Sequence, residues 1–149
     1  MTAANESTAS NVEDALAFFP LPSVGSLVDG RYRVKRLIGS GGMGAVFEAE
    51  QIAVGRRCAI KFLHAEVARR AQSEVRFERE ALLLGRLEHE HIIAVLDYAA
   101  YRNKSPFLVM EYLEGQTLQQ ALQERGKLPI DAALEILQQV ARGMAYVHA

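Results

Sequence analysis

Cysteine is almost absent from the sequence: Cys58 is the only one among 149 residues. A single thiol cannot close a disulfide within the chain, and its place beside Ala59 and Ile60 predicts a small buried hydrophobic side chain. The histidines, at positions 64, 89, 91 and 148, lack the spacing of zinc ligands. The sequence therefore favours a cytoplasmic chain and predicts no metal site.

The sequence also lacks an excess of positive or negative charge, and it lacks long apolar runs. The formal net charge is −1, so we expect no nucleic-acid partner. Crossing a bilayer takes about 18 apolar residues, whereas the nearest candidate, residues 15–24, is short and contains Pro20 and Pro22. No Lys or Arg precedes Arg31, although a signal peptide begins with positive charge. We expect neither secretion nor membrane contact by this segment.

Residues 1–27 differ in composition from the rest. They are rich in Ser, Thr, Asn and Ala, include acidic but no basic side chains, and show no sustained hydrophobic period. This composition predicts a flexible polar tail. Its most apolar part, residues 15–22, could dock on the folded part of the chain or on a partner, or could be a locally sticky disordered segment; we assign it no role.

The most informative segment is rich in glycine. Residues 39–46 read Gly-Ser-Gly-Gly-Met-Gly-Ala-Val, and Lys61 follows in an apolar stretch. Glycine lets backbone amides approach a polyphosphate and adopts angles that a Cβ atom would block, while lysine adds a mobile positive charge. Dinucleotide-binding oxidoreductases share the glycine spacing, but they need a helix that begins inside the motif. Here residues 32–37 and 46–50 alternate bulky and charged side chains, which indicates strands on both sides.

Periodicity along the rest of the chain predicts an α+β fold. From residue 31 we expect five strands, with one helix after the third, and then two further helices. Gly55 fits the turn before the third strand because glycine tolerates positive φ. The later elements are expected at residues 72–87 (helix), 93–98 and 107–111 (strands), and 117–124 and 129–148 (helices).

Taken in order, these segments resemble the amino-terminal part of a bacterial Hanks-type Ser/Thr protein kinase domain. The likeness covers residue 32 to the last residue and is specific in its motifs. They are the glycine-rich loop, Cys58-Ala59-Ile60-Lys61, Phe77-Glu78-Arg79-Glu80-Ala81, residues 87–93 and residues 107–115. The family usually has His-Pro-Asn where this chain has His89, Glu90 and His91. We interpret that segment as a capped turn rather than a metal site.

The resemblance implies a partial kinase domain over residues 31–149. Its parts would be an N-lobe with a five-stranded antiparallel sheet and one helix (31–111), a hinge (112–116) and two helices of an incomplete C-lobe (117–149). The last helix has an apolar stripe that other parts of a complete domain would cover. We therefore expect self-association through the exposed face of residues 130–147.

The resemblance also implies an ATP site. The backbone of Glu111 to Leu113 would recognise adenine, Met110 would close the back of the pocket, and apolar side chains would form its walls. The set that the likeness implies comprises Ile38, Gly39, Ser40, Gly41, Gly42, Met43, Gly44, Ala45, Val46, Ala59, Lys61, Glu80, Met110, Glu111, Leu113 and Leu118.

Lys61 and Glu80 are the expected ion pair of this site. A lysine in an apolar strand needs a partner or a ligand, unless its ammonium reaches water. Glu80 shares a helix face with Phe77 and Leu84, which we expect to pack on the sheet. A solvated pair between Glu80 and Arg76, or a role for Glu74 or Glu78 in its place, is the alternative that the residues leave open.

Motifs for catalysis are missing. The family continues into His-Arg-Asp, a metal-binding Asn and Asp-Phe-Gly, which orient the acceptor hydroxyl and bind Mg²⁺, and none of them occurs here. Asp97 and Asp131 follow Asp29, but the family pattern places both away from the phosphates. We expect the chain alone to be catalytically incompetent, with Mg²⁺ and protein substrates belonging to the complete domain. The alternative is a naturally short, non-catalytic module that binds a nucleotide or a protein.

Overall fold

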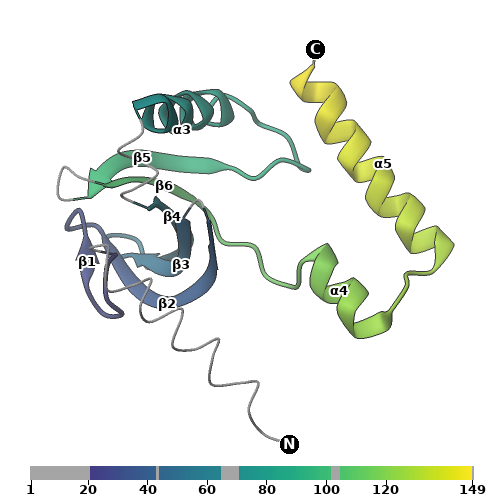
Figure 1. The fold of residues 1–149 in the computed structure, drawn as a ribbon, viewed down its shortest axis with the longest axis horizontal. Coiled ribbons are helices and arrows are strands. Elements are labelled where there is room, and N and C mark those ends of the chain that lie inside the picture. The colour runs from purple at the N-terminus through teal and green to yellow at the C-terminus, as the bar shows by residue number, and fades with distance from the viewer. Residues whose placement is uncertain (1–20, 43, 65–70, 102–104, 149) are drawn as a thin grey trace, which may run out of the picture.

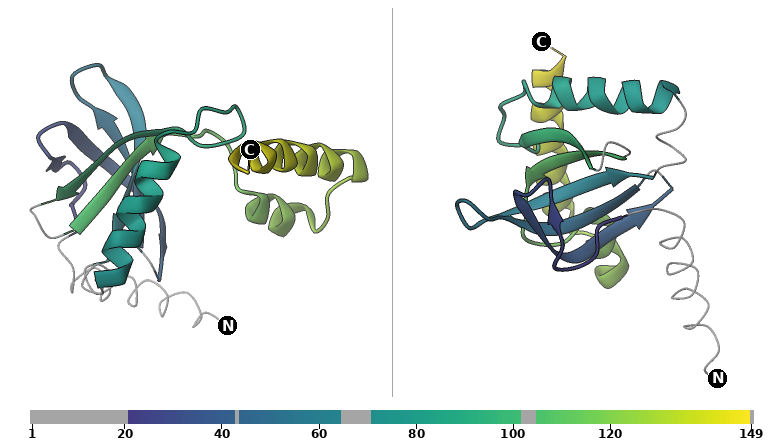
Figure 2. Two further views of the ribbon diagram at one scale, coloured as in Figure 1. Left: turned by 90° about the horizontal axis from the view of Figure 1, so that it is seen from above. Right: turned by 90° about the vertical axis from the view of Figure 1, so that its left-hand side faces the viewer.

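A computed structural model describes residues 21–42, 44–64, 71–101 and 105–148. Six strands form one antiparallel sheet in the order β1-β2-β3-β4-β6-β5. Helix α3 lies over β5 and β6, while α4 and α5 lie beside the sheet (Figures 1 and 2). The elements are β1 (Leu27–Val28), β2 (Tyr32–Gly41), β3 (Gly44–Gln51), β4 (Arg56–Leu63), α3 (Ala71–Leu84), β5 (Val95–Tyr101), β6 (Ser105–Glu111), α4 (Leu118–Arg125) and α5 (Ile130–Val147). The expected α+β class is confirmed.

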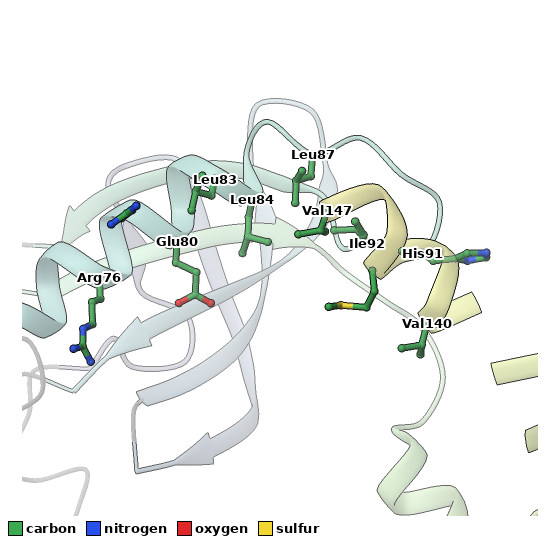
Figure 3. A pocket seen from close by; sticks show the side chains of 12 residues that line it. Arg76, Glu80, Leu83, Leu84, Leu87, His91, Ile92, Val140 and Val147 are labelled. Atoms are coloured by element: carbon green, nitrogen blue, oxygen red, sulfur yellow. The ribbon is translucent and has the colours of Figure 1, made fainter. Parts of the chain in front are cut away.

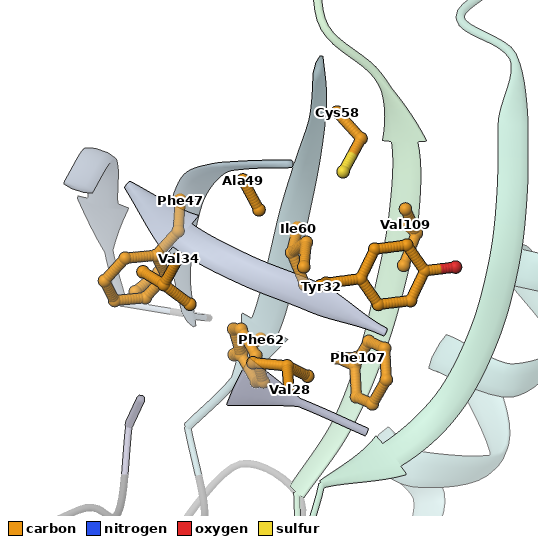
Figure 4. Packing of buried hydrophobic residues seen from close by; sticks show 11 residues of the cluster. Val28, Tyr32, Val34, Phe47, Ala49, Cys58, Ile60, Phe62, Phe107 and Val109 are labelled. Atoms are coloured by element: carbon orange, nitrogen blue, oxygen red, sulfur yellow. The ribbon is translucent and has the colours of Figure 1, made fainter. Parts of the chain in front are cut away.

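The main core lies on one face of the sheet. Along β4, Cys58, Ile60 and Phe62 are buried in one cluster, as the alternation of side chains in a strand requires. The ring of Phe62 lies 5.9 Å from that of Phe47 and 5.5 Å from that of Phe107, measured between centroids (Figure 4). Burial also raises the pKa of the Cys58 thiol. Ala59 and Lys61 therefore point to the other face.

Helix α3 is attached to that second face by a smaller cluster. Phe77 and Ala81, one helical turn apart, are buried with Leu63 of β4 and Leu108 of β6. The ring of Phe77 lies 5.9 Å from that of Tyr98 on β5. These contacts explain why α3 crosses the end of the sheet that contains β5 and β6.

The sheet is curled, which brings its two ends together. Tyr32 on β2 donates a hydrogen bond of 2.9 Å from its hydroxyl to Asp97 on β5, although these strands are not neighbours in the sheet. Arg31 makes an ion pair of 2.7 Å with the same carboxylate. Burial, followed by the hydrogen bond to Asp97, raises the pKa of Tyr32 to about 12.

One strand more is present than the five that the sequence predicts. Leu27 and Val28 pair with Arg33 and Tyr32 across the turn at Asp29 and Gly30, both of which have positive φ. The pair Asp-Gly favours a hairpin turn. The composition of residues 1–27, from which the tail was predicted, does not reveal this turn. The expected tail of residues 1–27 thus overlaps β1, and Leu21 packs against the main core. Residues 1–20 lie outside the described part of the chain.

Element boundaries shift by a few residues from the predicted ones. The helix expected at 72–87 ends at Leu84, because Gly85, a poor helix former, follows it. The strands expected at 93–98 and 107–111 are Val95–Tyr101 and Ser105–Glu111. Gly55 has the expected positive φ of 63°.

The two last helices begin where their capping residues allow. Thr117 accepts a hydrogen bond from the backbone N–H of Gln120, and the Gln120 side chain accepts one from the backbone of Thr117, so a capping box starts α4. Helix α5 follows Pro129 and meets the loop before β5 at Gly143, where a Cβ would lie 3.3 Å from the carbonyl oxygen of His91. None of the helices in the described ranges is both long and apolar enough to span a membrane.

Candidate functional site

The glycine-rich segment is the turn of the hairpin between β2 and β3. Gly39 lies opposite Val46, and Gly41 lies opposite Gly44; Met43 is outside the described residues. A Cβ at Gly44 would lie 1.9 Å from the carbonyl oxygen of Phe62, so only glycine fits between the hairpin and β4.

For the other glycines of the hairpin, only one of the two predicted reasons applies in this structure. Gly39, Gly41 and Gly42 do not have positive φ, and a Cβ on any of them would meet no atom within 4 Å. In this conformation their backbone angles do not require glycine. What these glycines provide is open space over the backbone, which a ligand can enter closely.

His64 contacts the hairpin from the end of β4. Its Nε2 lies 2.8 Å from the carbonyl oxygen of Gly41, and because a carbonyl can only accept, this nitrogen donates. The bond joins residues 23 positions apart in the sequence. No local sequence pattern predicts this contact, because its two residues are far apart along the chain.

The register of the ladder places several predicted residues on one face. Val46 lies opposite Lys61, and Ala59 lies opposite Met110. All four point away from the main core, with Ala59 buried and the others half-buried. Ala45 points the opposite way and is fully buried in the main core, so only its backbone faces the predicted site.

Lys61 and Glu80 do not form an ion pair in this structure as far as the described residues show. Glu80 extends from α3 into the space beneath the helix (Figure 3). The predicted common face of Phe77, Glu80 and Leu84 is divided: Phe77 is buried against the sheet, while Glu80 and Leu84 line a pocket between α3 and α5. The reason is that the residue that packs on the sheet together with Phe77 is Ala81 rather than Leu84.

That pocket between α3 and α5 has a volume of about 530 Å³ and is largely apolar. Leu83, Leu84 and Leu87 line it from the side of α3, and Val140, Met144 and Val147 line it from α5 (Figure 3). Neither Val46 nor Ala59 lines it.

The linker between β6 and α4 comprises residues 112–117, and Glu111 fixes its start. The Glu111 backbone N–H donates to the carbonyl of Ala94 (3.0 Å), and its carboxylate accepts from the Ala94 N–H (2.7 Å). Ile38 on β2 and Leu118 at the start of α4, which were predicted as apolar walls of the adenine pocket, have exposed side chains. The side chain of Leu113, whose backbone was predicted to recognise adenine, is exposed as well.

The two histidines before β5 form the expected capped turn. His89 Nδ1 accepts a hydrogen bond of 3.1 Å from the backbone N–H of His91. The ring of His89 also lies 5.1 Å from that of Tyr146 on α5. Within the described ranges, no three His, Cys, Asp or Glu residues are grouped so that they could bind a metal ion.

A family model and similar known proteins point to the same family. The family model "Protein kinase domain" matches residues 32–149. The chain is 43% identical to the serine/threonine-protein kinase pkn2 of Myxococcus xanthus, over 82% of this chain and 14% of that protein. It is 38% identical to the serine/threonine-protein kinase PknA of Mycobacterium tuberculosis, over 86% of this chain and 31% of that protein.

Solved structures agree with this match. The crystal structure of the Mycobacterium tuberculosis PknI kinase domain superposes with a TM-score of 0.75 at 28% identity, over 86% of this chain and 52% of that chain. The chain therefore spans about half of that kinase domain, and 14% and 31% of the two curated relatives.

Proposed function

The chain belongs to the protein kinase family, and from this we propose that it forms the ATP-binding part of a Ser/Thr protein kinase. In the complete domain, the γ-phosphate of ATP is transferred to Ser or Thr hydroxyls of protein substrates. The observation that supports this most directly is the ladder register that places Val46, Ala59 and Lys61 on one sheet face. Such a face offers apolar contact for a base and a cation for phosphates.

The phosphates would lie against the glycine hairpin. The open space over Gly39, Gly41 and Gly42 lets the oxygens of ATP approach backbone amides. Lys61 would supply positive charge from β4, and His64 would hold the hairpin through Gly41.

Glu80 would pair with Lys61 when ATP is bound. Helix α3 lies on this side of the sheet because Phe77 and Ala81 contact Leu108, which is the ladder partner of Lys61. Rotation of the Glu80 side chain, together with a shift of α3 towards the sheet, would complete the pair.

Adenine would bind at the linker. Its edge would meet backbone groups of residues 111–113, and its faces would cover the exposed side chains of Ile38, Leu113 and Leu118. Met110, half-buried opposite Ala59, would close the inner end of the pocket.

Chemistry would require the remainder of a kinase domain. Asp97 is bonded to Tyr32 and Arg31, and Asp131 lies in the first turn of α5. Neither is positioned to orient an acceptor hydroxyl or to bind Mg²⁺ beside the glycine hairpin. We propose that the chain by itself transfers no phosphate and uses Mg²⁺ only within the complete domain.

Self-association through α5 forms part of the proposal. Ile130, Leu137 and Val140 on this helix are more than half exposed, and exposed apolar stripes favour association. We place the protein in the cytoplasm, where ATP is available and where the single thiol stays reduced.

An NMR titration with ATP tests the proposed site. We expect a dissociation constant of about 1 mM or weaker, with shifted amide signals in residues 39–46 and 111–113 and little effect of Mg²⁺. Lys61→Ala should abolish these shifts. Lys35→Ala, which removes the same charge from a lysine paired with Glu50 on the sheet, should leave them unchanged. Unshifted hairpin signals in the wild-type chain would contradict the proposal.

The mass of the native protein separates this function from that of a short binding module. Capture from the native source with an antibody to the first residues should give a mass well above 16.5 kDa. A mass of 16.5 kDa would instead support the non-catalytic module.

A further inference from the structure

Side chains of three neighbouring strands, β2, β3 and β4, meet at the carboxylate of Glu48 on β3. The Glu48 side chain is only 12% exposed. Arg57 on β4 binds its Oε1 through Nε and Nη2, both at 3.1 Å. Arg36 on β2 places Nε 2.7 Å from its Oε2, as an ion pair outside hydrogen-bond geometry. A nearly buried carboxylate thus holds two guanidinium groups side by side.

The same two arginines contact the linker. The guanidinium carbon of Arg57 lies 4.1 Å from the centroid of the Tyr112 ring, which is a cation–π arrangement. Arg36 donates from Nη2 to the Tyr112 hydroxyl at 3.0 Å. Arg57 also reaches Glu114 at 2.6 Å, but Glu114 is 79% exposed, so water weakens that pair.

These contacts matter because the linker has few others. Among the described residues, the backbone of residues 112–116 makes no hydrogen bond to other backbone groups. Its position after Glu111 therefore depends on side chains, and Tyr112 is the side chain that two arginines contact from both its ring face and its hydroxyl.

The location is adjacent to the proposed adenine contacts. In the ladder, Glu48 lies opposite Ala59, and Arg57 precedes Ala59 by two residues. Because side chains alternate along a strand, Glu48 and Arg57 lie on the same sheet face as Val46 and Lys61. Tyr112 lies between Glu111 and Leu113, whose backbone would recognise the base.

We propose that Arg36, Glu48, Arg57 and Tyr112 form a linker latch, which positions the backbone of residues 111–113 for adenine. Arg57 is a positioning residue, since it acts through Tyr112. Its planar guanidinium stacks on a ring with one face and bonds a carboxylate with its edge, which a lysine cannot do at once. The role of the latch in adenine binding rests on the proposed ATP site. The claim that the latch holds the linker in place does not depend on that site.

The first test needs no nucleotide. We expect ¹⁵N order parameters of residues 112–115 near 0.85 in the wild-type chain and below about 0.6 in Arg57→Ala. Arg57→Lys should resemble Arg57→Ala, because charge without the planar group does not stack. Tyr112→Leu should also lower the order parameters of the linker, because it removes the ring and the hydroxyl that the two arginines contact. Unchanged linker order in Arg57→Ala, or full recovery in Arg57→Lys, would overturn the latch.

Arg56→Ala is the matched control. It removes the same charge from the adjacent position on β4, where the side chain points to the other face and no ion pair is present among the described residues. It should leave the order of the linker unchanged.

The second test separates positioning from general damage. Arg57→Ala should weaken ATP binding about fivefold, as the loss of a stacked cation would predict, while binding of inorganic tripolyphosphate stays the same. Equal losses for both ligands would overturn the positioning role. If the wild-type chain fails to bind ATP, the proposed function fails, while the order parameters still decide whether the latch exists.

Discussion

Two apolar surfaces of this molecule contrast. In the curled sheet, Ile60, Phe62 and Val109 are fully buried. On α5, Leu137 is 62% exposed and Ile130 is 78% exposed. Both regions follow the hydrophobic period of their secondary structure, which is two residues in the strands and about 3.6 residues in the helix.

The difference shows that a hydrophobic period predicts the type of secondary structure but not whether its apolar side chains are buried. The sheet closes its core with its own strands, and the bond from Tyr32 to Asp97 joins its two ends. Helix α5 approaches the rest of the described chain at Gly143 and Tyr146, but many of its apolar side chains remain exposed. The two regions should therefore respond differently to the same kind of substitution.

The largest contrast is expected between Phe62→Ala and Leu137→Ala. Phe62 fills the centre of the core, so its truncation should lower the free energy of unfolding by about 3–5 kcal/mol, whereas Leu137→Ala should change it by less than about 0.5 kcal/mol. Urea denaturation followed by circular dichroism measures both. If Phe62→Ala does not fold, Ile60→Val should still cost about 0.5–1.5 kcal/mol. Equal effects at residues 62 and 137 would mean that α5 is covered.

Gly44→Ala probes the tightest backbone contact of the sheet. The new Cβ would lie 1.9 Å from the carbonyl oxygen of Phe62, so the hairpin must move away from β4, at a cost on the order of 2–3 kcal/mol. Gly42→Ala, where a Cβ meets open space, is the control and should cost less than about 1 kcal/mol. A stable Gly44→Ala would show that the hairpin can shift freely.

Tyr32 makes the closure of the sheet depend on pH. Its pKa is raised to about 12, from about 10 in an unfolded chain, so the folded chain holds the phenol proton more tightly. The resulting stability is present in full below about pH 10 and is lost as the pH rises towards about 12. Tyr32→Phe should remove this slope, a difference on the order of 1–2 kcal/mol. Urea midpoints at pH 9 and about pH 11.5 compare the two chains; parallel curves would argue against the shift.

The smallest effect on stability is expected for Leu137→Glu, which tests the open surface. The charge lies on an exposed stripe, so the fold should change by less than about 0.5 kcal/mol, while self-association should fall. Sedimentation velocity over a range of concentrations measures the association. Gln138→Glu, at the next position of the same helix and also exposed, is the control. Identical sedimentation of wild type and Leu137→Glu would exclude this face as the contact.

The elements that contain the candidate site residues could be predicted from the sequence because each of them has a local pattern. The glycine hairpin, the strand of Lys61 and the helix of Glu80 each have a local pattern. The contacts of His64 with Gly41 and of Arg57 with Tyr112 could not be predicted, because they join side chains on elements whose approach depends on the curl of the sheet. The division of Phe77 from Glu80 and Leu84 depends likewise on the angle at which α3 crosses β5 and β6.

By itself, the sequence determined the α+β class, the family motifs and the face on which Val46, Ala59 and Lys61 lie, since strand alternation is a property of the backbone. Only the tertiary structure decided that Gly44 is required by the carbonyl of Phe62, that Asp97 closes the sheet on Tyr32, and that two arginines hold Tyr112 beside the sheet. The physical reason is that a local pattern sets the direction of a side chain, whereas its partner depends on how distant strands come together in space.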